Sequence, residues 1–306
     1  MKSDFRKYKK SGLILADALK YAKEITEPGI KLIDIAEKVE NFIRNQSAQP
    51  AFPVNISINE IAAHYSPVVN DDSTIPEGSI VKIDAGVSVD GFLTDAARTF
   101  IFDDKWTKMK LLAETALENA LKAIKPNDSV FMVGEIVEKI VKKEGYKPIV
   151  NLSGHLMTRY SLHGGVSIPN YKISREARDD SHRFIPGNVY AIEPFVTTGS
   201  GKVFDDKNIT IYRHYRDFKK NEVPEEVEEI YLYIKQNFCN LPFSWRWIFN
   251  SGFSIKQIER AKEVFLSKNI VHGYPVLVES KFAPVTQAEE TIYVSENDII
   301  ILTNTK

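Results

Sequence analysis

The spacing of apolar residues along the chain switches between a helical period and a strand period. Residues 5–26 and 31–45 have apolar positions every three to four residues, and Pro28 separates them, so they predict two consecutive helices. Strand-like and helical stretches then alternate. The predicted strands are 79–88, 91–101, 149–168 and 188–197, and the later predicted helices are 105–124 and 129–144.

The first pair of predicted helices resembles the second pair. Laid over residues 126–141, residues 28–43 share the leading proline, two glutamates and six apolar positions. Amphipathic helices that follow a proline resemble one another in any case, which is the simpler interpretation. However, IPEGSIVKID, ending at Asp84, also resembles IPGNVYAIE, ending at Glu193, and a histidine precedes each. The sequence therefore favours a duplicated α/β unit with a site between its halves.

A later part of the chain departs from this repeat. It is rich in aromatic and charged residues, and PEEVEEIYLYIKQNF (224–238) combines an initial proline with an apolar helical face. Ser254 and Gln257 have the spacing of a capping box at the start of a further helix. Strand-like alternation resumes afterwards. The predicted parts are a main domain at 1–206 and 271–306 and an inserted helical subdomain at 207–270.

Composition limits the cellular setting and the partners. Hydrophobic residues make up 43% of the chain and charged residues 26%, which is ordinary for a globular protein. A net charge of −1 gives no global basic field for nucleic acid or an anionic membrane. Cys239 is the single cysteine, and the sequence has neither a signal-peptide pattern nor an apolar run long enough to span a bilayer. These features predict a cytoplasmic protein.

Two aspartates in the predicted hairpin 82–100 need an explanation. If Asp90 and Gly91 form a two-residue turn, Gly86 lies opposite Asp95. Asp84 then shares the face of Asp95, as a diagonal neighbour roughly 7–8 Å away. Carboxylates this close in an apolar setting repel each other unless a proton or a cation lies between them. A three-residue turn would place them on opposite faces instead.

Other residues with metal-binding side chains also lie in strand-like, apolar surroundings. They are Glu193, the pair Glu289-Glu290, and the histidines His155 and His163. Taken singly, a carboxylate in a strand more often pairs with an arginine, and a histidine is more often a core residue. Taken together, an oxygen-rich set with imidazole suits a pair of divalent ions such as zinc, manganese, iron or cobalt. A structural zinc site, which prefers thiolates, is disfavoured.

Six segments in order resemble the motifs of methionine aminopeptidases: AAHYSP (62–67), IDAG…TDAA (83–97), SGH (153–155), LHGG (162–165), AIEPF (191–195) and TQAEET (286–291). The spacings, eleven residues between the aspartates and eight between the histidines, also resemble those of the family. The insertion is similar to that of type II enzymes, and the start of the chain resembles archaeal forms that lack the eukaryotic N-terminal extension. The resemblance extends over essentially the whole chain.

The resemblance implies an α+β, pita-bread fold, in which two pseudo-symmetric halves enclose two divalent metal ions. It also implies that Asp95 and Glu289 bridge the ions. Glu289, two residues after a glutamine, matches the ligand position, while Glu290 occupies a position that is commonly histidine in type II enzymes. The implied metal ligands are Asp84, Asp95, His155, Glu193 and Glu289.

The resemblance further implies hydrolysis of the first peptide bond by a metal-activated water, with release of an N-terminal methionine before a small second residue. Glu193 would move the proton, His163 would stabilise the oxyanion, and His64 would hold the scissile bond. The residues implied to bind substrate are His64, His163, Phe52, Leu162, His214 and Tyr274.

Rival interpretations stay within the same fold. Proline-specific aminopeptidases share the site geometry but typically carry an N-terminal domain and lack the insertion. Non-catalytic relatives that bind RNA or protein have lost the metal ligands, all of which are present here. The expected partners are peptides and nascent polypeptides with an N-terminal methionine, with no specific nucleic acid and no membrane. We expect a monomer, and the basic N-terminal helix is a candidate for ribosome docking.

Overall fold

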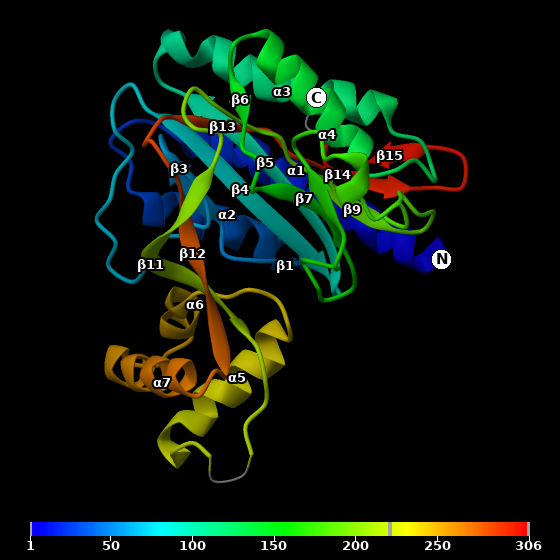
Figure 1. The fold of residues 1–306 in the computed structure, drawn as a ribbon. Coiled ribbons are helices and arrows are strands. Elements are labelled where there is room, and N and C mark those ends of the chain that lie inside the picture. The colour runs from blue at the N-terminus through cyan, green and yellow to red at the C-terminus, as the bar shows by residue number, and fades with distance from the viewer. Residues whose placement is uncertain (1, 220–221, 305–306) are drawn as a thin grey trace.

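The computed structural model describes residues 2–219 and 222–304, and it mixes helices with antiparallel strands (Figure 1). The helices are α1 (Lys2–Ile25), α2 (Leu32–Asn45), α3 (Thr107–Ala123), α4 (Phe131–Lys143), α5 (Glu228–Phe238), α6 (Trp245–Asn250) and α7 (Ile255–Ser267). The strands are β1 (Gln49–Pro50), β2 (Asn55–Ile58), β3 (Ile61–Ala63), β4 (Ile80–Val89), β5 (Phe92–Ile101), β6 (Lys147–Pro148), β7 (Ser153–Met157), β8 (Ser167–Pro169), β9 (Val189–Ile192), β10 (Phe195–Thr197), β11 (Val203–His214), β12 (Val271–Glu279), β13 (Val285–Gln287), β14 (Glu290–Val294) and β15 (Ile299–Ile301).

Most predicted elements agree with the structure to within a few residues, but two predicted strands are divided. The strand predicted over 188–197 is divided into β9 and β10, which belong to different sheets, and the other was predicted over 149–168. This stretch contains β7 and β8, while β6 precedes it. A turn closed by Thr158 and Ser161 separates β7 from β8. A positive φ of 90° at Gly165 further bends the connection, so the apolar run cannot continue as one strand.

In the first half of the molecule, α1 and α2 cover one face of the long β4–β5 hairpin (Figure 1). The inward face of α2 carries Ile35, Val39 and Ile43, all fully buried, with a spacing of three to four residues. β1 and β2 pair with β4 and extend the sheet. This half therefore has its own hydrophobic core beneath its helix pair.

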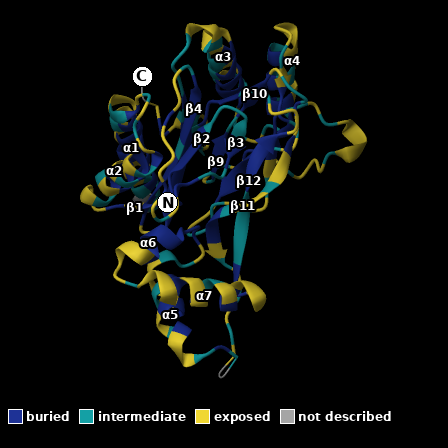
Figure 2. Ribbon diagram, turned by 90° about the vertical axis from the view of Figure 1, so that its left-hand side faces the viewer, coloured by how far each residue is buried: buried dark blue, intermediate teal, exposed yellow. Residues whose placement is uncertain are grey.

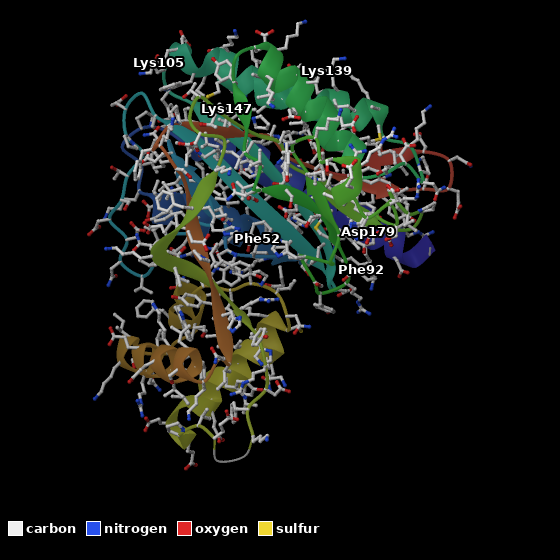
Figure 3. The ribbon with its side chains drawn as sticks, viewed as in Figure 1. Phe52, Phe92, Lys105, Lys139, Lys147 and Asp179 are labelled. Carbon is white, nitrogen blue, oxygen red and sulfur yellow. The ribbon has the colours of Figure 1, made fainter. Side chains whose placement is uncertain are left out.

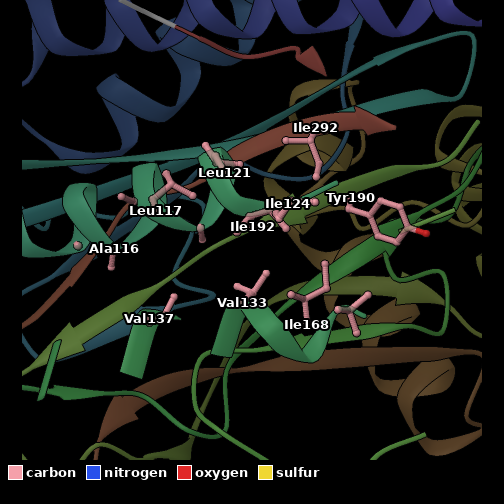
Figure 4. Packing of buried hydrophobic residues seen from close by; sticks show 14 of the residues in the cluster. Ala116, Leu117, Leu121, Ile124, Val133, Val137, Ile168, Tyr190, Ile192 and Ile292 are labelled. Atoms are coloured by element: carbon pink, nitrogen blue, oxygen red, sulfur yellow. The ribbon is translucent and has the colours of Figure 1, made fainter. Parts of the chain in front are cut away.

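In the second half, α3 and α4 cover a sheet of order β15-β14-β9-β7-β8. Leu117 and Leu121 of α3 and Val133 and Val137 of α4 face the apolar side chains of the strands, including Ile192 (Figure 4). The exposed residues of both helices point outward, whereas the strands between the helix layers are buried (Figure 2). A helix pair over antiparallel strands thus occurs twice, as the sequence repeat predicts.

The chain between β11 and β12 forms a separate group of helices, α5, α6 and α7, which stands apart from the two halves (Figure 1). The predicted capping box of α7 is present, with Ser254 and Gln257 each bonding the backbone of the other. Aromatic side chains fill a core of their own, which includes Phe243, Trp245 and Trp247. The boundaries of the inserted subdomain at 207 and 270 stay a prediction.

The antiparallel ribbon β11–β12 presents different side chains on its two faces. Residues 211 to 214 pair in regular register with residues 274 to 271. Tyr212 and Val271 belong to the aromatic core of the insertion. Because successive side chains of a strand point to opposite faces, Ile211 and Arg213 face the other way. One ribbon thus contributes to two separate parts of the molecule.

A buried ion pair between Arg246 of α6 and Glu40 of α2 connects the insertion to the first half. Arg246 of α6, only 1% exposed, donates from Nη1 and Nη2 to the two carboxylate oxygens of Glu40 of α2, at 2.9 and 2.8 Å. Glu40 also accepts hydrogen bonds from Trp247 Nε1 at 2.6 Å and from the backbone N–H of Val54 at 3.2 Å. Arg246 Nε donates to the carbonyl of Pro67. This network connects α2, α6 and the segment that leads into β2.

Within the described part of the chain, every helix is too short or too polar to traverse a lipid bilayer.

Candidate metal centre and its cavity

The β4–β5 hairpin brings Asp84 and Asp95 to one face of its sheet. Asp90 and Gly91 form the two-residue turn, with φ of 52° and 84°, as a type I′ turn requires. Gly86 therefore pairs with Asp95 and Asp84 pairs with Ala97, which confirms the predicted register. Asp95 is 4% exposed, and Asp84 is partly exposed toward a cavity.

The second half supplies three further acidic or imidazole side chains. His155 lies on β7, while Glu193 directly follows β9 and Glu289 directly precedes β14. His155 Nε2 lies 3.5 Å from Asp95 Oδ2 and 3.8 Å from Glu193 Oε1. One ligand atom each from Asp95, His155 and Glu289 lies within 4.8 Å of the other two. Residues far apart in sequence thus converge on one point between the halves.

The carboxylates of this cluster lack the partners that buried charges need. Asp84 Oδ1, Asp95 Oδ1 and Glu289 Oε1 are buried oxygens without a hydrogen-bond partner among the described residues. Burial and the neighbouring aspartates raise the pKa of Glu193 and of Glu289 well above the usual range. A divalent cation would satisfy these oxygens and offset their repulsion, so the residues present fit a metal site.

His155 suits the same role. Burial lowers its pKa to about 4, so the imidazole is neutral near pH 7 and keeps a free lone pair. A neutral imidazole is the form that binds a metal ion.

A cavity of about 460 Å³ opens beside this cluster, with Phe52, His64, Leu162, His163 and Tyr274 in its wall. Phe52 lies next to the β4–β5 hairpin (Figure 3). The ring centroid of Tyr274 is 5.6 Å from that of His64 and 6.2 Å from that of His163. The His163 ring is also 4.7 Å from that of His155. The two predicted non-ligand histidines therefore flank the space next to the candidate metal ligands.

His64 is held in a defined orientation. Its Nδ1 lies 3.2 Å from the carbonyl oxygen of Pro275, and since a carbonyl only accepts, Nδ1 carries the hydrogen. Burial lowers the pKa of His64, so its Nε2 remains an unprotonated acceptor. The backbone of His64 has a φ of 66°, a conformation that is costly for a non-glycine residue and that often occurs at functional sites.

The structure does not bring His214 to this cavity. Its ring lies 5.7 Å from Tyr231, and its Nε2 lies 3.2 Å from Asp217 Oδ1, both on the side of the insertion. Ile211, three residues earlier, faces the cavity instead, because side-chain direction alternates along β11. Sequence reasoning missed further wall residues, among them Ile211, because the sequence alone does not show which positions of β11 face the cavity. These wall residues include Asn55, Phe195, Ile211, Pro242 and Leu277.

Glu290 points away from Glu289 and is paired. Its Oε1 accepts a 2.5 Å hydrogen bond from Arg98 Nη2, and Thr303 donates to its second oxygen. Arg98 Nη1 also donates to the backbone carbonyl of Glu289 at 2.7 Å. The neighbouring glutamates thus have different surroundings, and Glu289 alone faces the cluster.

Comparisons with known proteins agree with this arrangement. The sequence model of metallopeptidase family M24 matches residues 6–219. The chain is 40% identical to a methionine aminopeptidase of Saccharolobus solfataricus, with 96% of this chain and 95% of that protein covered. It is 38% identical to a methionine aminopeptidase of Pyrococcus abyssi, with coverages of 98% and 99%.

Solved structures show the same fold. A thermophilic Arx1 superimposes with a TM-score of 0.82 at 19% identity, covering 99% of this chain and 91% of that one. A methionine aminopeptidase of Thermotoga maritima gives a TM-score of 0.70 at 22% identity, with coverages of 99% and 98%. The predicted α+β, pita-bread fold is confirmed. The chain belongs to metallopeptidase family M24 and, within it, to the archaeal-type methionine aminopeptidases.

Proposed function

We propose that this protein removes the N-terminal methionine from peptides and nascent polypeptides whose second residue is small. The observation that carries the proposal is the convergence of buried, unpartnered carboxylate oxygens and a neutral imidazole beside a cavity that also holds two further histidines. The proposed ligands of two divalent ions are Asp84, Asp95, His155, Glu193 and Glu289.

The residues around the cluster have complementary roles in this proposal. Bound divalent ions supply the positive charge that makes a water molecule nucleophilic near neutral pH and polarises the scissile carbonyl. Glu193, whose pKa is raised by burial and by Asp95 and Asp84, accepts the proton of that water and passes it to the leaving amine. His163 donates an N–H to the developing oxyanion. His64 Nε2 accepts a hydrogen bond from the peptide and fixes its position.

The apolar wall of the cavity provides the selectivity for methionine. Phe52, Leu162 and Tyr274 surround the space next to the histidines, and Ile211 replaces His214 in this proposed pocket. A thioether side chain fits such an apolar and aromatic lining. A larger second residue would meet the cavity wall, which restricts that position to small side chains.

The proposal also covers the cellular location, the oligomeric state and contact with the ribosome. We propose that the protein acts in the cytoplasm, where nascent polypeptides are made, and that it is a monomer. The exposed basic residues of α1, including Lys9 and Lys10, are the surface that we propose for contact with the ribosome.

Metal dependence and peptide choice test the proposed function. After chelation, the protein is expected to release no methionine from Met-Ala-Ser, and addition of manganese, iron, cobalt or zinc should restore the release, measured by chromatography. Ala-Pro peptides, which a proline-specific aminopeptidase would cleave, serve as the comparison. If no added metal gives methionine release, or if Ala-Pro is the better substrate, the proposal fails.

A methyl group at Gly86 is expected to disturb the methionine pocket. A Cβ at this position would lie 2.4 Å from Phe52 Cε1 and 2.9 Å from Ala51 Cβ, so Phe52 has to move. We expect Gly86→Ala to destabilise the protein by about 1–3 kcal/mol and to raise KM for Met-Ala-Ser about tenfold. Urea unfolding and peptide kinetics measure the two effects.

Phe52→Leu provides the matched test, since the smaller side chain removes the 2.4 Å contact with the Phe52 ring and leaves only the one with Ala51 Cβ. Gly86→Ala combined with Phe52→Leu should therefore regain part of the lost stability. Equal stability of Gly86→Ala and the unmodified protein would show that the close approach of Phe52 and Gly86 carries no cost.

A further inference from the structure

The wall of the cavity continues outward along one face of the β11–β12 ribbon. Ile211 pairs with Tyr274, and both line the cavity. Two residues further along each strand, Arg213 pairs with His272. Side chains two residues apart lie on the same face of a strand, so Arg213 and His272 extend the row of Ile211 and Tyr274 away from the cavity.

Arg213 offers a free positive charge on this row. It is exposed and has no carboxylate partner among residues 2–219 and 222–304. Its guanidinium lies 5.9 Å from the centroid of the Tyr215 ring, and that ring stacks on His272 at 3.8 Å with an angle of 13°. The Arg213 guanidinium therefore packs against the stacked rings of Tyr215 and His272 and is available to bind a ligand.

The charge of Arg213 also reaches the cavity. Burial is the main cause that lowers the pKa of His163, and Arg213 contributes to the same lowering. Burial raises the pKa of Tyr274, and Arg213 opposes this rise. The strand register places Arg213 on the face of Ile211 and Tyr274, which both line the cavity, so the guanidinium lies on the cavity side of the ribbon.

We propose that Arg213, supported by Tyr215 and His272, forms a subsite for the third residue of the substrate and favours an acidic side chain there. The proposal rests on the proposed function. Two residues of a strand span about 6.6 Å, which equals the span of two residues of an extended peptide. A peptide whose scissile bond lies beside Tyr274 therefore brings its third residue to Arg213.

The position of the row beside the cavity and the positive charge of Arg213 both favour a substrate peptide with an acidic third residue. The row starts at the cavity wall with Ile211 and Tyr274, so a chain that leaves the cavity along this face of the ribbon next meets Arg213 and His272. A guanidinium pairs with carboxylates and disfavours cationic side chains. The chemical class recognised is thus a peptide with aspartate or glutamate two residues after the methionine.

Two peptide amides of equal size test the subsite, Met-Ala-Asp-amide and Met-Ala-Asn-amide, because they differ in one charge and carry no terminal carboxylate. With the metal-loaded protein, we expect kcat/KM to be about threefold higher for the aspartyl peptide at low ionic strength, as is typical of an exposed ion pair. The preference should shrink as salt is added. Arg213→Ala should remove it, and Arg213→Glu should invert it.

Lys262→Glu is the matched control. It makes the same change of charge, but Lys262 lies over Tyr212 on the opposite face of the ribbon, so the peptide preference should stay that of the unmodified protein. An Asp-to-Asn ratio that is the same in Arg213→Glu and the unmodified protein overturns the subsite. Absence of methionine release from both peptides by the unmodified protein overturns the proposed function instead.

Discussion

Replacement of Glu289 with glutamine is expected to abolish metal binding and, at the same time, to raise the melting temperature of the metal-free protein. Glu289 is 1% exposed, and burial together with the charges of Asp95 and Glu193 raises its pKa well above the usual range. The amide removes one charge from this group and relieves the repulsion. Each kcal/mol gained corresponds to about 2 °C in a protein of this size.

Thermal unfolding with and without manganese measures both effects. For the unmodified protein, a hundredfold excess of metal over Kd should contribute about 2.7 kcal/mol of stability. Glu289→Gln should show no such increase, and its activity should fall at least about a hundredfold.

Glu290→Gln is the neighbouring control. Glu290 faces Arg98 and Thr303, so this variant should keep the metal-induced stabilisation and stay within about threefold of full activity. If the two variants exchange these properties, Glu290 and not Glu289 is the ligand.

Replacement of Arg246 with methionine is expected to destabilise the protein by about 3–5 kcal/mol. The change removes both charge-assisted hydrogen bonds of the buried Glu40 carboxylate and leaves Arg44, whose Nη1 lies 3.8 Å from Glu40 Oε2, as its cation; a poorly compensated buried charge is costly. Glu40 would also retain the hydrogen bonds from Trp247 and Val54. Equilibrium unfolding in urea measures the loss.

Glu40→Gln in the Arg246→Met background tests the cause. The amide carries no charge and keeps one accepting oxygen, for either Trp247 or Val54, which donate to different oxygens of Glu40. The double variant should therefore be more stable than Arg246→Met alone. Arg260→Met removes an exposed pair with Glu226 and should cost less than about 1 kcal/mol. A similar loss for Arg260→Met and Arg246→Met would contradict the argument from burial.

The sequence predicts the hairpin with Asp84 and Asp95 because the relevant information is local. An Asp-Gly turn of two residues determines which positions pair, and strand alternation then determines which side chains share a face. The duplicated helix pairs are likewise visible because each proline and each apolar face recurs in the same order. Local patterns of this kind are sufficient for half of the site.

The rest of the site depends on contacts between distant segments. His214 is a candidate for the pocket because it carries an imidazole next to the insertion. The sequence does not show, however, whether the even or the odd positions of β11 face the cavity. The structure shows that the odd positions do, so Ile211 lines the cavity and His214 does not. The pairing of Arg98 with Glu290 joins β5 to the start of β14, and no spacing rule connects residues nearly two hundred positions apart.

The two-faced ribbon β11–β12 has a consequence for how the length of this chain can vary among descendants. Deletion of a single residue of β11 just before Ile211 would turn every following side chain to the opposite face. Ile211 would then leave the cavity wall, and Tyr212 would leave the aromatic core of the insertion. Gains and losses of sequence are therefore expected in the connections among α5, α6 and α7, while the ribbon keeps its length or changes by two residues at a time.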